Sequence, residues 1–486
     1  MKTYSAWILL ALCMLISFYA KSEEATIQIK ASNLNGRELS YHRTYCGVYL
    51  STFSPIELDN DSTYTITMPV EGIERMMIIA NDPGMKLPGF HRSFYVLPGT
   101  TEITVDPLAE DNVAIRLPTS NKADVLAARS ADTVYDLWFT LATGRKDTLG
   151  LYADSIPTDV TAKLDAYVDS LGKEYAGASD AIREAMVRDA RLETLMVYDI
   201  CMYHAQNNQN IDEWKQEFNR LREKIGLAHH TNARNPFFAS QIANNLFYED
   251  TYPDRKIPRN IAPDSILLLK TDYFLNTMPG KTAEAAIGAM LYNDAENGTF
   301  SPVAQDITER FKEIFPKSGL IPFLDEKAHE NHAFNHPEAS DDIVFLNNSD
   351  IKTLGELLAP YKGTPVLIDI WATWCRPCRE SFSHVVPIQE YADSNGVQLL
   401  YLSIDEQPGI EEKWKRMARY YKLKGHHVLV NPAIKQEVYS TFGDNSILSI
   451  PRFAIVDRDG NITVCPQPLS ESTDFTPLRD LLDKVK

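Results

Sequence analysis

The sequence predicts a multidomain protein with an N-terminal antiparallel β-sandwich, a central α-helical region and a C-terminal α/β fold. Three observations lead to this prediction. The chain of 486 residues is too long for one ordinary core. The spacing of its apolar residues changes from strand-like to helical near residue 120, and strand-like and helix-like segments alternate after about residue 343. The predicted domains are therefore 24–117, 120–316 and 343–486, with a linker at 317–342.

The first twenty residues have the layout of a secretory signal peptide and are not expected to be part of the fold. Lys2 supplies a positive charge, residues 6–18 are uncharged and mostly apolar, and Ala20 is a candidate cleavage residue. The apolar run is slightly shorter than the roughly 20 residues of a membrane-spanning helix. We therefore expect export to the periplasm and removal of residues 1–20, with an uncleaved N-terminal membrane anchor as the alternative.

Residues 24 to about 117 contain short β-rich stretches separated by Gly, Pro and Asn. The predicted strands lie at 26–29, 63–68, 76–80, 94–97 and 101–105. Short strands at regular spacing are typical of an antiparallel sandwich. This region also resembles the β-rich domain that precedes TlpA-like domains in some Gram-negative proteins, a resemblance that implies no activity.

The region from about 120 to 316 shows helical periodicity instead. Apolar side chains recur on one narrow arc of a helix, at Ile182, Met186, Ala190, Val197 and Cys201. We expect several packed helices here.

The linker that follows contains His329, His332 and His336, whose spacing is similar to that of metal ligands. Because these histidines lie in a segment without a clear helical pattern, we predict a solvated connector and no metal site.

The last part of the chain alternates between strands and helices. Strands are expected at 365–370, 397–404, 453–456 and 462–464, and helices at 376–393, 410–421 and 476–484. The residues Arg458-Asp459-Gly460-Asn461 between the last two strands predict a hairpin. This order of elements favours an α/β sandwich.

Cys375 and Cys378 stand at the junction of a predicted strand and a predicted helix, with Trp374 before the first cysteine and Pro377 before the second. Unpaired N–H groups in the first turn of a helix lower the pKa of a thiol. Cys375 is therefore the expected attacking thiolate, and Cys378, one turn further, is placed to resolve a mixed disulfide. Arg376 adds positive charge, and Pro377 suits a helix start because its missing N–H costs nothing there.

These residues resemble the thioredoxin superfamily, and more narrowly its exported TlpA-like and ResA-like branch. The resemblance covers residues 343–486. Three separate motifs carry it: Trp-Ala-Thr-Trp-Cys-x-Pro-Cys-Arg at 371–379, Ser-Ile-Pro at 449–451, and the hairpin at 455–462.

The resemblance implies a thioredoxin-like fold and particular roles for several residues. Pro451 would follow a cis peptide bond beside the cysteines, Ile450 would pair with an extended substrate, and Trp374 would lie near that substrate. Asp369 matches the buried carboxylate that accepts a proton from the second cysteine, and burial should raise its pKa. Many relatives carry a glutamate three residues after the second cysteine, where this chain has Ser381.

The leading functional hypothesis is a thiol–disulfide oxidoreductase of the protein-disulfide reductase type. The expected partners are disulfide-containing exported proteins and a membrane electron donor, and no cofactor is needed. Two alternatives remain: a partner-binding surface protein with a secondary redox domain, and a peroxiredoxin-like peroxidase, whose P-x-x-x-T-x-x-C context is absent around Cys375.

The remaining composition excludes other classes of protein. A net charge of −18 and the lack of a Lys/Arg-rich run argue against nucleic acid as a partner. Half of a zinc site is disfavoured because there is no second C-x-x-C, while a permanent structural disulfide on a redox-inactive fold is a further alternative. Cys46, Cys201 and Cys465 are expected in cores, and one further disulfide among them is left open.

Overall fold

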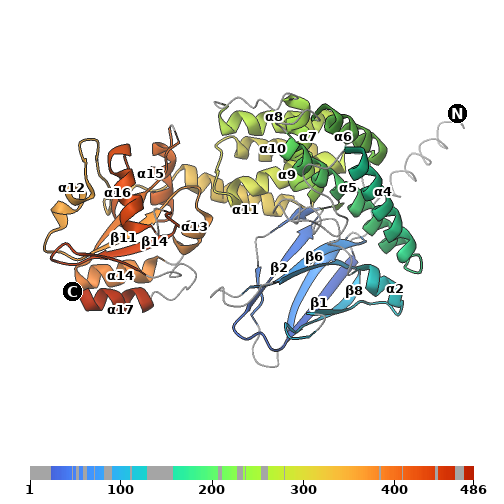
Figure 1. Ribbon diagram of the computed structural model, residues 1–486, viewed down its shortest axis with the longest axis horizontal. Helices are drawn as coiled ribbons and strands as arrows, with labels where there is room; N and C mark the ends of the chain where they lie inside the picture. Colours follow the sequence, from blue (N-terminus) through green and yellow to red (C-terminus); the bar gives the residue numbers. More distant parts are fainter. Residues whose placement is uncertain are drawn as a thin grey trace, which may run out of the picture. The chain divides into compact units, whose positions relative to one another are not determined.

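The structure is a computed structural model whose described part divides into two compact units (Figure 1). The N-terminal unit contains residues up to Tyr292 together with Glu309–Leu324, and the C-terminal unit contains Asn293–Thr308 and Asp325–Lys486. The structure describes residues 23–45, 47–50, 54–57, 63–70, 72–81, 90–109, 112–128, 157–205, 211–226, 234–235, 237–252, 261–278, 280–382, 385–407, 409–443, 447–465 and 476–485. The expected signal peptide and Cys46 lie outside these residues.

The β-rich part of the N-terminal unit forms two sheets. The first has the order β5-β1-β8-β9, with β1 Glu23–Ala31, β5 Tyr64–Val70, β8 Gly99–Val105 and β9 Val113–Arg116. The second has the order β3-β2-β6-β7 with β4 paired to β2, and its strands are β2 Glu38–Tyr45, β3 Val48–Tyr49, β4 Ser54–Pro55, β6 Glu74–Asn81 and β7 Phe90–Val96. Buried and exposed residues alternate along β5, β8 and β9, so one face of the first sheet is covered.

One strand pair departs from the predicted antiparallel arrangement. β1 and β8 are parallel, with Ile27 opposite Thr101. All the described strands of the second sheet lie between β1 and β8 in the chain, so the connection is long enough for the chain to return in the same direction. The prediction of a wholly antiparallel region was therefore wrong for this pair, while the packing of the two sheets as a sandwich stays a prediction.

Helices make up the central region, as expected. They are α2 Lys122–Ala128, α4 Pro157–Glu174, α5 Asp180–Ala205, α6 Ile211–Ile225, the π-helix η2 Phe238–Ile242, α7 Ala243–Thr251, α8 Pro263–Thr277, α9 Lys281–Glu296, α10 Ala304–Ile314 and α11 Ile321–Asn335. The five residues predicted to share one arc of α5 are all buried. No helix in the described residues is long and apolar enough to cross a membrane.

A buried ion pair joins this helical region to the second sheet. Arg75 on β6 pairs with Glu193 on α5, and both side chains are almost fully buried. The guanidinium of Arg75 also lies 5.1 Å from the ring centre of Phe237, and Asn235 donates a hydrogen bond to the Glu193 carboxylate. Paired in this way, the two charges can be buried between a strand and a helix.

The segment expected to be a solvated linker contains helix α11 instead. Its apolar residues are few, but Leu324 and Phe334 are buried, and the Phe334 ring stacks on Phe300 with 4.2 Å between ring centres. The sequence did not predict this helix, because the exposed histidines interrupt any apolar pattern. The rings of His332 and His336 stack on each other one turn apart, with 4.3 Å between ring centres.

The C-terminal unit is built on a six-stranded sheet with the order β10-β13-β12-β11-β14-β15. The strands are β10 Ile343–Phe345, β11 Val366–Trp371, β12 Gln398–Ser403, β13 Gly425–Leu429, β14 Arg452–Val456 and β15 Ile462–Val464. The first four strands in this order are parallel to one another. β14 runs antiparallel to β11, and β15 pairs antiparallel with β14 to complete the hairpin. Every residue of the central strand β11 is buried.

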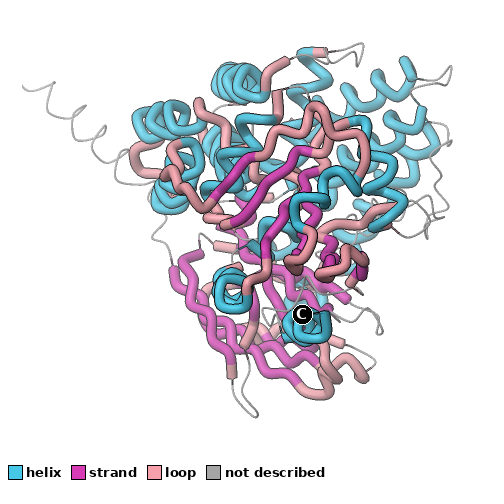
Figure 2. Tube along the Cα trace, turned by 90° about the vertical axis from the view of Figure 1, so that its left-hand side faces the viewer, coloured by secondary structure: helices cyan, strands magenta, loops and turns pink. Residues whose placement is uncertain are grey.

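Helices flank this sheet on both sides (Figures 1 and 2). They are α12 Leu354–Leu358, the 3₁₀ helix η3 Ala359–Tyr361, α13 Arg376–Phe382, α14 Val386–Asn395, α15 Glu411–Tyr420, α16 Pro432–Phe442 and α17 Thr476–Val485. In Figure 1, α14 and α17 lie side by side, where Tyr391 donates a 2.6 Å hydrogen bond to Asp483. The predicted strands and helices of this unit are confirmed with one exception.

The exception is the helix predicted over 376–393, which is two helices, α13 and α14. Pro387 stands in the first turn of α14, where its missing N–H leaves no bond unmade. Within a continuous helix the same proline would remove a hydrogen bond, so the residues favour a new helix start here. The consequence is a short α13 that carries the cysteine pair at its beginning.

Candidate active site

The two cysteines of the motif are joined at the start of α13. Cys375 and Cys378 form a disulfide with 5.3 Å between their Cα atoms, and the backbone N–H of Cys378 donates a 3.2 Å hydrogen bond to Cys375 Sγ. Cys375 retains 4% exposure and Cys378 has none. A first-turn N–H that points at a sulfur stabilises negative charge on it, so this geometry favours a thiolate at Cys375.

Two tryptophans flank the cysteine loop in different environments. Trp371, at the end of β11, is buried and meets the Phe382 ring edge-on at 5.1 Å, whereas the Trp374 side chain is 54% exposed. An exposed ring next to the accessible cysteine offers apolar surface to an incoming protein segment. The structure therefore separates a core tryptophan from a surface tryptophan.

The charge of Arg376 is partly balanced by its own helix. Its Nε donates a 2.8 Å hydrogen bond to Glu380, one turn later, and the Glu380 side chain is 62% exposed. An exposed pair of this kind contributes little energy. Arg376 therefore adds less positive field at Cys375 than an unpaired guanidinium would.

Asp369 lies in the middle of β11 with its side chain buried. Burial raises the pKa of this carboxyl to about 8, and its Oδ1 atom has no hydrogen-bond partner among the residues that the structure describes. The side chain lines a cavity of about 10 Å³, enough for roughly one water molecule. Ser381 lines the same cavity, and its hydroxyl donates a 3.0 Å hydrogen bond to the Cys378 carbonyl.

A second buried carboxylate, Asp405, holds the loop that leads to the cysteines. It accepts hydrogen bonds of 2.8 Å from both the N–H and the hydroxyl of Thr373 and one of 2.7 Å from the Ser403 hydroxyl. Sequence reasoning missed this residue, because an aspartate just after a strand is common and its partner is known only once β11 and β12 are paired.

Arg379, the residue after the second cysteine, is also buried. Its Nη2 donates a 3.2 Å hydrogen bond to the Glu296 carbonyl at the end of α9, where a cation is favourable for the helix dipole. The guanidinium lies so close to Gly298 that a Cβ built on that glycine would be 2.6 Å from Arg379 Cζ. The arginine of the motif thus fixes α13 to residues just after α9.

The family model described as Redoxin matches residues 342–476. The thiol-disulfide oxidoreductase ResA of Bacillus thuringiensis subsp. konkukian is 26% identical over 105 residues, which cover 22% of this chain and 56% of that protein. The chloroplastic M-type thioredoxin of Pisum sativum is 32% identical over 114 residues, which cover 22% of this chain and 58% of that protein. The chain thus spans little more than half the length of these relatives.

Among solved structures, the thioredoxin domain of a thiol-disulfide oxidoreductase from Bacteroides vulgatus is similar to this chain. It is 22% identical, covers 26% of this chain and 84% of that chain, and has a TM-score of 0.22. Residues 342–476 belong to the thioredoxin superfamily.

The thioredoxin-superfamily domain contains the expected cis peptide bond, between Ile450 and Pro451. Pro451 is buried and Ile450 is half-buried. The strand that follows, β14, pairs with β11 so that Phe453 stands opposite Asp369. Pairing of β11 with β14 therefore brings the segment that follows Pro451 beside the strand that leads to the cysteines.

Two further cysteines, Cys201 and Cys465, lie among the described residues, and neither is joined to the Cys375–Cys378 pair. Cys465 is a buried free thiol whose pKa burial raises to about 11. Cys201 is buried on α5, in the N-terminal unit. A buried thiol with a raised pKa is a poor nucleophile, so Cys465 does not compete with Cys375.

Proposed function

We propose that this chain is a thiol–disulfide oxidoreductase that reduces disulfides of exported proteins through a Cys375/Cys378 dithiol–disulfide cycle. The observation that supports this most directly is the closed cysteine pair at the N-terminal end of α13, with the Cys378 N–H directed at Cys375 Sγ. The thiol-disulfide oxidoreductases among the similar proteins support the same chemistry.

The proposed reaction transfers two electrons to the substrate. In the reduced form the Cys375 thiolate attacks one sulfur of the substrate disulfide, which forms a mixed disulfide and releases the other substrate sulfur as a thiolate. Cys378, once deprotonated, attacks Cys375 Sγ, closes the Cys375–Cys378 disulfide and releases the second substrate thiolate. A dithiol carried by a membrane electron donor then reduces the pair again.

We assign the proton of Cys378 to Asp369. A carboxyl whose pKa is raised to about 8 is matched to proton transfer near neutral pH. The resolving step requires Asp369 in its ionised form, to accept the proton as the Cys378 thiol becomes a thiolate. Trp374, Ile450 and Pro451 are the proposed contacts of the substrate segment, and the periplasm is the proposed location.

Substrate trapping tests these roles. With Cys378→Ser, the mixed disulfide on Cys375 cannot be resolved and should accumulate as covalent adducts with proteins of the periplasm. With Cys375→Ala no attack occurs, and no adduct should form. Adducts are identified on non-reducing gels and by mass spectrometry, and their disappearance on treatment with dithiothreitol is the control. Adducts on both variants, or on neither, would contradict the assignment of attacker and resolver.

A further inference from the structure

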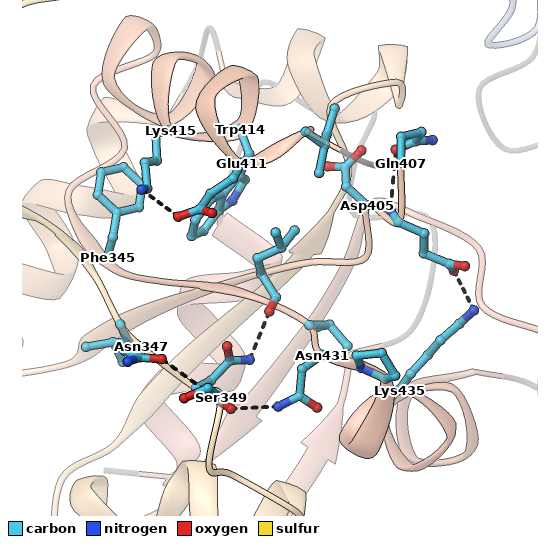
Figure 3. Close-up of a pocket in the computed structure, with 17 residues that line it drawn as sticks. Phe345, Asn347, Ser349, Asp405, Gln407, Glu411, Trp414, Lys415, Asn431 and Lys435 are labelled. Atoms are coloured by element: carbon cyan, nitrogen blue, oxygen red, sulfur yellow. Dashed lines mark hydrogen bonds and ion pairs between the residues drawn. The ribbon is translucent and has the colours of Figure 1, made fainter. Parts of the chain in front are cut away.

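A pocket opens at the carboxyl ends of the parallel strands β10, β12 and β13 (Figure 3). Its volume of about 860 Å³ lies within the range of about 300 to 1,000 Å³ that is usual for ligand sites. Because parallel strands end at one edge of a sheet, the three loops that follow them form the walls of a single hollow. Nothing in the redox cycle described above uses this pocket.

The pocket is connected to the redox site through one side chain. Asp405 lines the pocket, and its carboxylate binds the N–H and hydroxyl of Thr373, two residues before Cys375. A protein segment that lies in the pocket therefore contacts a residue that holds the cysteine loop. Because Asp405 belongs to both, the pocket adjoins the loop that carries Cys375.

The charged residues that line the pocket are already paired. Lys435 lies 2.5 Å from Glu406, and Lys415 lies 2.6 Å from Glu411. A dashed line in Figure 3 marks the ion pair between Lys415 and Glu411. The fifth charged residue, Asp405, accepts three hydrogen bonds. Each lysine of the lining has an acidic partner, so the pocket presents no unmatched lysine charge that would select an anionic ligand, and it is suited to an uncharged one.

The rest of the lining combines an apolar floor with uncharged polar side chains. The Phe345 and Trp414 rings meet edge-on with 5.0 Å between centres. Around them, the side chains of Asn347, Ser349 and Gln407 are exposed, and among the described residues Asn347 Nδ2, Ser349 Oγ and Gln407 Nε2 have no hydrogen-bond partner. Apolar surface bordered by amide and hydroxyl groups matches a polypeptide, which presents an apolar side chain and backbone amides together.

We propose that this pocket binds an extended, uncharged segment of the protein substrate whose disulfide reacts at Cys375. An apolar side chain of that segment packs against Phe345 and Trp414, and its backbone amides pair with Asn347, Ser349 and Gln407. The inference rests on the proposed reductase function and adds to it a second contact region, on loops distinct from the segment around Pro451. Small disulfides that lack such a segment would gain nothing from the pocket.

The test fills the pocket without altering the cysteines. Ser349→Trp replaces an exposed serine at the rim of the pocket by a large side chain. The matched control, Ser440→Trp, makes the same change at an exposed position of α16 outside the pocket. Pre-reduced full-length protein, freed of reductant, is mixed with insulin or with 5,5′-dithiobis(2-nitrobenzoate). Oxidation of the cysteine pair is followed by tryptophan fluorescence or by nitrothiobenzoate release.

Ser349→Trp should lower the second-order rate constant for insulin by about tenfold, corresponding to the lost burial of one apolar side chain. The rate with the small disulfide should stay within about twofold of wild type, and Ser440→Trp should match wild type with both substrates. Equal insulin rates for Ser349→Trp and wild type, or an equal loss with both substrates, would overturn the inference. A wild-type protein that reacts with neither substrate would instead overturn the proposed function.

Discussion

At the scale of single residues, the candidate site contains a carboxyl group that is buried without a full set of hydrogen bonds. Asp369 lies on a strand whose residues are all buried, and its Oδ1 accepts no hydrogen bond from any described residue. The cost of ionising it there raises its pKa to about 8, which makes protein stability depend on pH.

Asp369→Asn should change this dependence in a definite direction. Below pH 3.8 the carboxyl is protonated in both folded and unfolded chains. Between that pH and about 8 it ionises only in the unfolded chain, so wild-type stability falls as pH rises and then levels off. The free energy of unfolding of the oxidised variant, relative to that of wild type, should therefore increase from pH 5 to pH 9 by on the order of a few kcal/mol.

The melting temperatures of both oxidised proteins across this pH range provide the measurement. Asp341→Asn, at an exposed carboxylate of the same unit, is the matched control and should differ from wild type equally at pH 5 and pH 9. A constant difference between Asp369→Asn and wild type would show that the carboxyl is not held neutral by burial.

Sequence reasoning predicted the positions of those residues whose placement follows from local spacing. Cys375 and Cys378 were predicted from the C-x-x-C motif at a strand–helix junction, and the buried position of Asp369 follows from its apolar strand. Asp405 and Arg379 were missed because their partners, Thr373 and the Glu296 carbonyl, are distant in the chain. Only the paired sheet and the packed helices reveal such contacts.

At the scale of elements, the buried Arg75–Glu193 ion pair links strand β6 to helix α5. Burial raises the pKa of Glu193 to about 7, although the neighbouring Arg75 acts to lower it. Glu193→Gln keeps the shape of the side chain but leaves the buried guanidinium without this countercharge. We expect a loss of about 3 to 5 kcal/mol in the stability of the N-terminal unit.

Chemical denaturation followed by circular dichroism measures this loss. Glu102→Gln is the matched control, because Glu102 forms an exposed pair with Arg116 at 3.4 Å. Its effect should be below about 1 kcal/mol. If the two variants were equally stable, the buried pair would not be coupling the strand to the helix.

Helices and strands whose apolar residues recur with a clear period were predicted well, and those whose apolar residues show no clear period were not. The strands of the C-terminal sheet follow runs of buried apolar residues, whereas α11 has few apolar positions and was taken for a linker. The parallel pairing of β1 with β8 could not be predicted, because strand direction depends on where the chain travels between the two strands.

At the scale of the whole molecule, the thioredoxin-superfamily domain is larger than its family match. The C-terminal unit includes Asn293–Thr308 and residues from Asp325 onward, so two segments before residue 342 belong to it. Phe300 and Phe334, one from each segment, stack on each other and contact the Tyr420 ring. The sequence predicted a boundary at 343, because the alternation of strands and helices begins there. These two segments come before that point in the chain and show no such alternation.

Phe334→Ala should therefore destabilise the unit that carries the cysteines, although Phe334 lies outside the family match. A fully buried phenylalanine replaced by alanine costs about 3 to 5 kcal/mol. The loss is measured as a lower melting temperature of the oxidised protein, with Val344→Ala, at a 39% exposed apolar residue, as the control. A melting temperature equal to that of wild type would mean that these segments do not support the domain.

The glycine beside Arg379 has an evolutionary consequence. Gly298 has a φ of 68°, and the arginine next to the second cysteine fills the space where a side chain would grow. Natural variation at position 298 should therefore be tied to variation at position 379: lineages that keep the arginine should keep the glycine. A loop with no chemistry of its own would then show the same selective pressure as the redox motif.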